Sequence, residues 1–154
     1  MTKNEGRAIE ILLVEDNDGD ARLTREALID GKVWNSLHRV NDGVQALAFL
    51  AGTGEYVGSP RPDLILLDLN LPGMDGREVL ATVKADTALA AIPIAVLTTS
   101  NAEQEFLEAY GLNANCYIVK PFDLQQLLDV VNAIEDFWLC VVTMPRSNLA
   151  QVGA

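Results

Sequence analysis

Five reactive or charged side chains follow directly after short apolar runs of the sequence, namely Glu15, Asp16, Asp68, Thr98 and Lys120. Carboxylates bind divalent metal ions and can attack a phosphoryl group, whereas hydroxyl and ammonium groups can contact phosphoryl oxygens. In open α/β sheets, ligands bind at the carboxyl ends of parallel strands, beside the point where the strand order reverses. If the apolar runs are neighbouring parallel strands, these side chains converge on one crevice that suits a divalent metal and a phosphoryl group.

Strands that alternate with helices must bring these side chains together. Strands are predicted over residues 9–14, 37–40, 64–67, 94–97 and 116–119. Helices are predicted after a turn at 17–20, around 44–50, near 77–85, near 102–110 and from 123 to about 138, with a loop at 52–62. Each crossover through a helix makes the next strand parallel, so the sequence predicts an α/β fold with a parallel sheet covered on both faces.

Two of the predicted helices have apolar positions at helical spacing. The first carries Leu23, Ala27 and Leu28 on one face. The last begins at Asp123, whose spacing from Gln126 matches a capping box. Its apolar positions are Leu124, Leu127, Leu128, Val131, Ile134 and Trp138. Both helices are therefore expected to pack on the sheet.

The composition is that of an acidic globular protein of 154 residues. Its 11 Lys and Arg residues and 22 Asp and Glu residues give a formal net charge of -11, which argues against non-specific nucleic-acid binding. Two cysteines are too few for a disulfide framework. The chain shows neither a secretory signal nor an apolar run of membrane-spanning length, so we expect a soluble cytoplasmic protein. We expect an N-terminal extension at 1–8, one domain over 9–140 and a C-terminal tail at 141–154.

The acidic residues at the predicted strand ends suit Mg²⁺, which binds near-octahedrally to oxygen ligands and keeps several waters. Asp16 and Asp68 are expected to be direct ligands, with Glu15 acting directly or through water. Without a metal, converging carboxylates repel one another. The alternative is that Glu15 and Asp16 only cap the first helix, since acidic residues are common at helix starts. That alternative is weaker for Asp68, because no helix is predicted directly after it.

Asp68 is the candidate phosphoacceptor, because a carboxylate can attack a phosphoryl group and form an acyl phosphate. Positioning and charge neutralisation supply most of the catalysis in phosphoryl transfer. Lys120 can neutralise one phosphoryl oxygen and the Thr98 hydroxyl can donate a hydrogen bond to another. Lys120 could instead be an ordinary surface lysine, although its position at a strand end before a proline favours the site.

With these residues, the chain resembles the receiver domain of two-component response regulators, a (βα)5 doubly wound, flavodoxin-like fold with a central five-stranded parallel sheet. The resemblance covers residues 9–138 and is carried by Leu13-Val14-Glu15-Asp16-Asn17, Asp68-Leu69-Asn70-Leu71-Pro72-Gly73-Met74-Asp75-Gly76, Thr98 and Lys120-Pro121-Phe122. It implies a signalling protein that takes a phosphoryl group from a sensor histidine kinase, and not a metabolic enzyme.

The resemblance also assigns roles to individual residues. It implies that Asp68 is the phosphoacceptor and that Mg²⁺ is held by Asp16, Asp68 and the backbone carbonyl of Asn70. Glu15 occupies the first acidic position, which many family members fill with aspartate. Tyr117 matches the switch aromatic of the family, whose ring can enter the space left when the Thr98 hydroxyl moves toward the phosphoryl group. An ordinary half-buried strand residue is the alternative for Tyr117.

The end of the last predicted helix carries apolar residues on more than one side, including Phe137, Trp138 and Val141. Such a segment forms an interface or folds back on its own domain, and we favour the interface. This tail and the loop at 54–56 resemble the small single-domain regulators of cyanobacterial phytochromes, called the Rcp type. That resemblance implies a phytochrome kinase as partner and a homodimer through the face formed by residues 101–110, 116–119 and 124–138.

Three other functions are compatible with a parallel α/β sheet. A phosphatase of the dehalogenase-like family would need a second Asp two residues after the nucleophile, where this chain has Asn70. A flavodoxin-type flavin carrier would need a phosphate-binding loop rich in Ser, Thr and Gly after the first strand, where this chain has the acidic residues 15–18. The third alternative, a dimeric interaction module that never accepts phosphate, is also consistent with the sequence.

Overall fold

The computed structural model describes residues 8–71, 76–98, 116–119 and 125–132. The strands are Ile9–Val14 (β1), Asn35–Val40 (β2), Leu64–Asp68 (β3), Ile94–Thr98 (β4) and Cys116–Val119 (β5). The helices are Asp18–Asp30 (α1), Gly43–Ala51 (α2) and Gly76–Ala85 (α3), with a short 3-10 helix at Gly54–Tyr56 and further helical residues at 125–132.

The strands form one five-stranded sheet in the order β2-β1-β3-β4-β5. Every neighbouring pair is parallel, as the β–α–β crossovers predict. The chain moves from β1 outward to β2, then returns to the other side of β1 to place β3, so the strand order reverses between β1 and β3. This sheet confirms the predicted doubly wound, flavodoxin-like fold.

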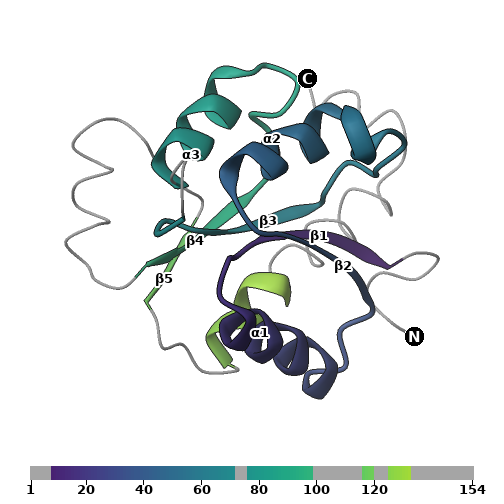
Figure 1. Ribbon diagram of the computed structural model, residues 1–154. Coiled ribbons are helices and arrows are strands. Elements are labelled where there is room, and N and C mark those ends of the chain that lie inside the picture. Colours follow the sequence, from purple (N-terminus) through teal and green to yellow (C-terminus); the bar gives the residue numbers. More distant parts are fainter. Residues whose placement is uncertain (1–7, 72–75, 99–115, 120–124, 133–154) are drawn as a thin grey trace, which may run out of the picture.

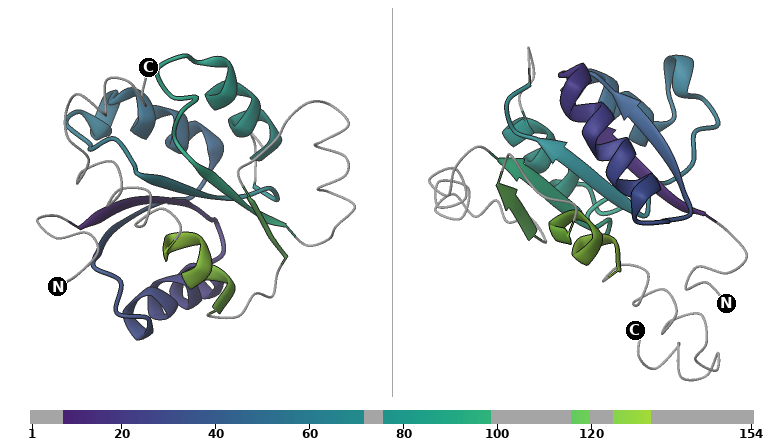
Figure 2. Two further views of the ribbon diagram at one scale, coloured as in Figure 1. Left: turned by 180° about the vertical axis from the view of Figure 1, so that it is seen from behind. Right: turned by 90° about the horizontal axis from the view of Figure 1, so that it is seen from below.

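Alternating side chains of the strands fill a hydrophobic core on each face of the sheet. One core packs strand residues such as Leu12 and Ile65 against α2 and α3. The other packs strand residues such as Leu13 and Leu66 against α1 and the helical residues 125–132. Figure 1 shows α2 and α3 above the sheet and α1 below it, and Figure 2 shows the helical residues 125–132 beside α1. Two covered faces leave the ends of the strands as the place for a site.

Most predicted elements are confirmed, with a few corrections. The prediction for Leu23 is wrong: its side chain is 61% exposed, and Ala21, Thr24 and Leu28 form the buried stripe of α1 instead. Leu28 is buried and Ala27 is partly buried against the same core, as predicted. The predicted strand at 37–40 begins earlier, at Asn35.

The last predicted helix is confirmed where the structure describes it. Leu127 and Val131 are fully buried in the core beneath α1. Leu128 lies against the end of α1, where a Cβ built on Gly31 would come within 2.3 Å of a Leu128 methyl carbon. The predicted helix at 102–110 lies outside the described residues, as do Leu124, Ile134 and Trp138. No helix in the described ranges is long and apolar enough to cross a membrane.

Candidate functional site

Three carboxylates meet at the carboxyl ends of β1 and β3. Glu15 and Asp16 follow β1, Asp68 ends β3, and one carboxylate oxygen from each lies within 4.8 Å of the other two. Glu15 and Asp68 are 0% and 4% exposed, whereas Asp16 faces solvent. The two strands are direct neighbours, since Val14 pairs with Leu67, and the strand order reverses between them. The predicted convergence of these acidic residues is therefore confirmed.

Glu15 and Asp16 do not cap the first helix. The N-cap of α1 is Asn17, whose side-chain oxygen accepts a 2.8 Å hydrogen bond from the backbone N–H of Asp20. The backbone N–H of Glu15 donates to the carbonyl of Val40 at 3.0 Å, which extends the pairing of β1 with β2 by one residue. The capping alternative is therefore wrong, because Asn17 performs that role and leaves the two acidic side chains at the strand ends.

The carboxylate of Asp68 is oriented by the backbone that follows it. The N–H of Asn70 donates to Oδ1 of Asp68 at 3.0 Å, and the N–H of Leu69 donates to the carbonyl of Leu97 at 3.3 Å. The Asn70 side chain is exposed. The start of α3 closes this turn, with the N–H of Gly76 donating to the carbonyl of Leu69 at 3.2 Å.

Gly76 has a role that the sequence analysis missed. A Cβ at this position would lie 2.5 Å from the carbonyl oxygen of Asp68 and 2.6 Å from Cα of Leu69. Only glycine lets α3 begin this close to the end of β3 without a shift of the backbone. The signal available in the sequence was the glycine that ends the turn after Asp68, but nothing in the sequence alone shows which backbone it approaches.

Thr98 and Tyr117 lie on the two strands beyond Asp68. Thr98 ends β4 and is fully buried, one residue after Leu97, which pairs with Asp68. Tyr117 is half-buried in β5, pairs with Val96 and packs against the core beneath α2 and α3. Thr98 thus sits at the same end of the sheet as the carboxylates, in the next strand along.

Four predicted site residues lie outside the part of the chain that the structure describes. Lys120 directly follows β5 in the sequence but lies outside the described residues. The predicted interface residues Phe137, Trp138 and Val141 also lie outside the described residues. Their roles therefore stay predictions.

The donor set of the site matches a hard divalent cation. Carboxylate oxygens are the ligands that Mg²⁺ and Mn²⁺ prefer in proteins. Two of the three carboxylates are buried and all three are close, an arrangement in which like charges repel unless a cation offsets them. A doubly wound sheet with three acidic residues at its switch point and a buried hydroxyl at the end of the next strand is the arrangement expected of a receiver domain.

Comparison with known proteins places the chain within that class. Residues 11–132 match the family described as the response regulator receiver domain, and the chain belongs to this family. It is a signalling family, so the phosphatase and flavin-carrier interpretations are set aside. The site residues Glu15, Asp16, Asp68, Thr98 and Tyr117 all lie within the matched range.

The predicted resemblance to Rcp-type regulators is also confirmed. Response regulator Rcp1 of Synechocystis sp. is 50% identical over 137 residues, which cover 89% of this chain and 93% of that protein. The structure of the phosphorylated cyanobacterial phytochrome response regulator RcpA aligns with a TM-score of 0.72 at 50% identity, covering 90% of this chain and 99% of that chain. The structure of the Mn²⁺-bound form of Rcp1 aligns with a TM-score of 0.70 at 50% identity, covering 89% of this chain and 99% of that chain.

Proposed function

We propose that this protein is a single-domain response regulator in which Asp68 accepts a phosphoryl group from a sensor histidine kinase in a reaction that requires Mg²⁺. The observation that carries the proposal is the approach of Glu15, Asp16 and Asp68 to within 4.8 Å of one another at the switch point of the sheet. The RcpA structure is of a phosphorylated protein and the Rcp1 structure is of a Mn²⁺-bound form, which supports the same chemistry here.

The metal would be held by the carboxylates of Glu15, Asp16 and Asp68 and by the backbone carbonyl of Asn70. When bound, the divalent ion neutralises the phosphoryl oxygens and the attacking carboxylate. Glu15 is longer than the aspartate it replaces, and its Oε2 accepts a 3.3 Å hydrogen bond from the N–H of Asn17. That bond draws the carboxylate back toward its own loop, so the longer side chain still ends beside Asp16 and Asp68.

The nucleophile of the transfer is the oriented carboxylate of Asp68. A carboxylate oxygen of Asp68 attacks the phosphorus of a phosphohistidine, the P–N bond breaks as the P–O bond forms, and the electron pair returns to the imidazole nitrogen of the donor. The N–H of Asn70, bound to Oδ1 at 3.0 Å, fixes the orientation of the carboxylate before the donor arrives. Hydrolysis of the resulting acyl phosphate by water returns the protein to its initial state.

The phosphoryl group would act as a switch through its neighbours on β4 and β5. Lys120 would pair with one phosphoryl oxygen and the Thr98 hydroxyl would donate to another. Movement of Thr98 would change the space open to the ring of Tyr117, which packs in the core beneath α2 and α3. The face formed by residues 101–110, 116–119 and 124–138 would then change its contacts with partner proteins.

The partner would be a phytochrome-type histidine kinase in the cytoplasm, by similarity to Rcp1 and RcpA. The net charge of -11 argues against non-specific binding of nucleic acid. We further propose a homodimer through the same face, with Phe137, Trp138 and Val141 in the interface.

Phosphotransfer from an autophosphorylated, radiolabelled phytochrome histidine kinase tests the pathway. Label should move to the parent protein in Mg²⁺ and should not move to Asp68→Asn. The matched control is Asp129→Asn, which makes the same change at an exposed carboxylate on the helical residues 125–132. Equal labelling of Asp68→Asn and the parent would contradict the phosphoacceptor, and signalling by a protein that takes no label would favour the phosphate-independent interaction module.

A further inference from the structure

We propose that Arg39 is a positioning residue of the metal site, which holds the segment from Glu15 to Asp18 in the geometry that binds the divalent ion. This inference rests on the proposed function, because it assigns a role within the same site. Arg39 is outside the motifs that identify the family in this chain, and it comes from β2, a strand that contributes none of the proposed metal ligands.

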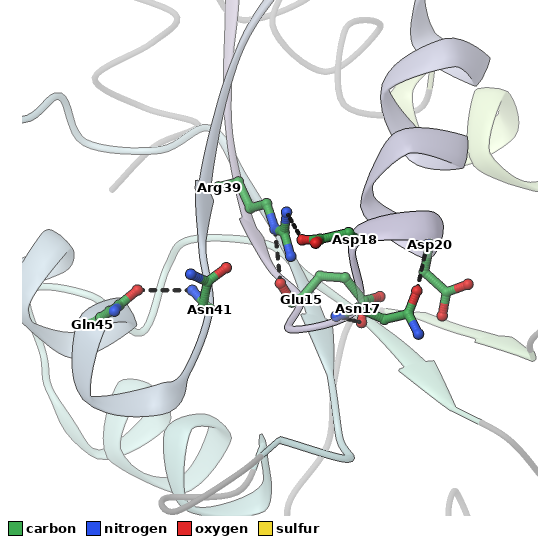
Figure 3. A network of polar contacts seen from close by, with 7 residues as sticks. All are labelled: Glu15, Asn17, Asp18, Asp20, Arg39, Asn41 and Gln45. Atoms are coloured by element: carbon green, nitrogen blue, oxygen red, sulfur yellow. Dashed lines mark hydrogen bonds and ion pairs between the residues drawn. The ribbon is translucent and has the colours of Figure 1, made fainter.

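Arg39 bridges two points of the segment that carries the acidic residues (Figure 3). Its Nε donates a 2.9 Å hydrogen bond to the backbone carbonyl of Glu15, and its Nη1 lies 2.8 Å from Oδ1 of Asp18. One contact precedes Asp16 in the chain and the other follows it. The guanidinium therefore holds the chain both before and after Asp16, the exposed residue among the proposed metal ligands.

The position of Arg39 in β2 explains why it reaches this segment. The next residue, Val40, accepts the backbone N–H of Glu15 at 3.0 Å. Both backbone polar groups of Glu15 are thus bound by consecutive residues of one strand. Because the backbone of Glu15 is held on both sides, its side chain leaves β1 in a fixed direction toward Asp68.

The two contacts use different nitrogen atoms of the guanidinium. Lysine carries the same charge but has a single nitrogen at its end, so it cannot reproduce both contacts from one planar group. Comparing Arg39→Lys with Arg39→Gln therefore separates the role of the geometry from the role of the charge.

Charge and geometry predict opposite effects on metal binding. A positive charge near the site repels a divalent cation, so removing it would strengthen metal binding if charge were the main effect. The salt bridge of Arg39 with Asp18 lies at the surface, since the Asp18 carboxylate is 93% exposed, so water and salt screen the effect that the lost charge has on the metal. Positioning should then dominate, and loss of Arg39 should weaken metal binding.

The test is a Mn²⁺ titration followed by the electron paramagnetic resonance signal of free Mn²⁺. We expect Arg39→Gln to raise the Mn²⁺ dissociation constant roughly tenfold, which is the lower end of the range for residues that orient metal ligands. Arg39→Lys should raise this constant by about threefold or more. The control Arg25→Gln removes one exposed charge from α1 and should stay within about twofold of the parent. Binding by Arg39→Gln as tight as the parent, or a loss in Arg25→Gln equal to that in Arg39→Gln, would overturn the proposal.

Two further measurements distinguish positioning from a general loss of structure. With a chelator present, Arg39→Lys should keep the urea unfolding midpoint of the parent within experimental error while its Mn²⁺ affinity falls. Its rate of phosphorylation by acetyl phosphate should fall at low Mg²⁺ and return to within about twofold of the parent at saturating Mg²⁺. A rate that stays low at saturating Mg²⁺ would contradict a role through metal binding. Failure of the parent itself to bind Mn²⁺ would overturn the proposed function, whereas normal binding by both Arg39 variants would overturn this inference alone.

Discussion

Replacing Asp68 with asparagine is expected to make the metal-free protein more stable, although it removes the proposed phosphoacceptor. Asp68 and Glu15 are both buried, and an oxygen of each lies within 4.8 Å of the other. Like charges held this close destabilise the fold when no cation is present. The amide oxygen of asparagine can still accept the hydrogen bond that Asn70 now donates to Oδ1.

The size of this effect follows from the distance between the charges. Two unit charges 4.8 Å apart repel by about 3.5 kcal/mol at an effective dielectric constant of 20 and by about 0.9 kcal/mol in water. The ammonium group of Lys120, which we propose pairs with a phosphoryl oxygen on Asp68, would also attract the carboxylate and so act in the opposite direction. We therefore expect a net gain near the lower figure, about 1 kcal/mol, which corresponds to a rise in Tm of roughly 2–4 °C for a chain of this size.

Urea unfolding followed by circular dichroism in a chelator measures this gain. Asp129→Asn is the matched control, since its amide oxygen can still accept from Gln125 and its carboxylate is exposed. The control should stay within about 0.5 kcal/mol of the parent. At a Mg²⁺ concentration 100 times its dissociation constant, the parent should gain about 2.7 kcal/mol and become the more stable protein. A lower stability of Asp68→Asn in the chelator would refute the repulsion argument.

Three other substitutions test separate parts of the account. Gly76→Ala should destabilise the protein by about 1–3 kcal/mol and slow phosphorylation, because the new Cβ would meet the carbonyl oxygen of Asp68 at 2.5 Å. Urea unfolding measures the loss of stability, and the rate of phosphorylation by acetyl phosphate measures the second effect. Lys120→Ala should bind Mn²⁺ like the parent yet lose most of the change that phosphate induces, and loss of metal affinity would contradict that division of roles. Phe137→Asp or Val141→Asp should lower the sedimentation coefficient if the tail is an interface, whereas unchanged sedimentation would place the tail on its own domain.

Local sequence patterns were enough to predict the fold and the three carboxylates. The apolar residues of β1, β3 and β4 are buried on both faces, so each strand has a strong hydrophobic signature, interrupted in β1 by Glu10, that ends at the polar residue of the site. Because parallel strands end at the same edge of the sheet, the order of the motifs along the chain already implied that Glu15, Asp16 and Asp68 would meet.

Contacts between distant segments could not be predicted in this way. The contacts of Arg39 with Glu15 and Asp18 depend on the register of β1 with β2, and an arginine near a strand end is an ordinary surface residue in the sequence. The close approach of Gly76 to Asp68 likewise depends on where α3 begins. The error at Leu23 has the same origin, since helical spacing predicts a stripe but not which of two adjacent stripes faces the sheet.

Intact mass after incubation with acetyl phosphate, with and without Mg²⁺, tests the central claim most directly. The account predicts one added phosphoryl group in the parent when Mg²⁺ is present, none in a chelator, and none in Asp68→Asn under either condition. Binding of beryllofluoride is the control for an acyl phosphate that hydrolyses too fast to be detected. Beryllofluoride should bind the parent in Mg²⁺ and should not bind Asp68→Asn. A phosphoryl adduct on Asp68→Asn, or no adduct and no beryllofluoride binding in the parent, would contradict the account.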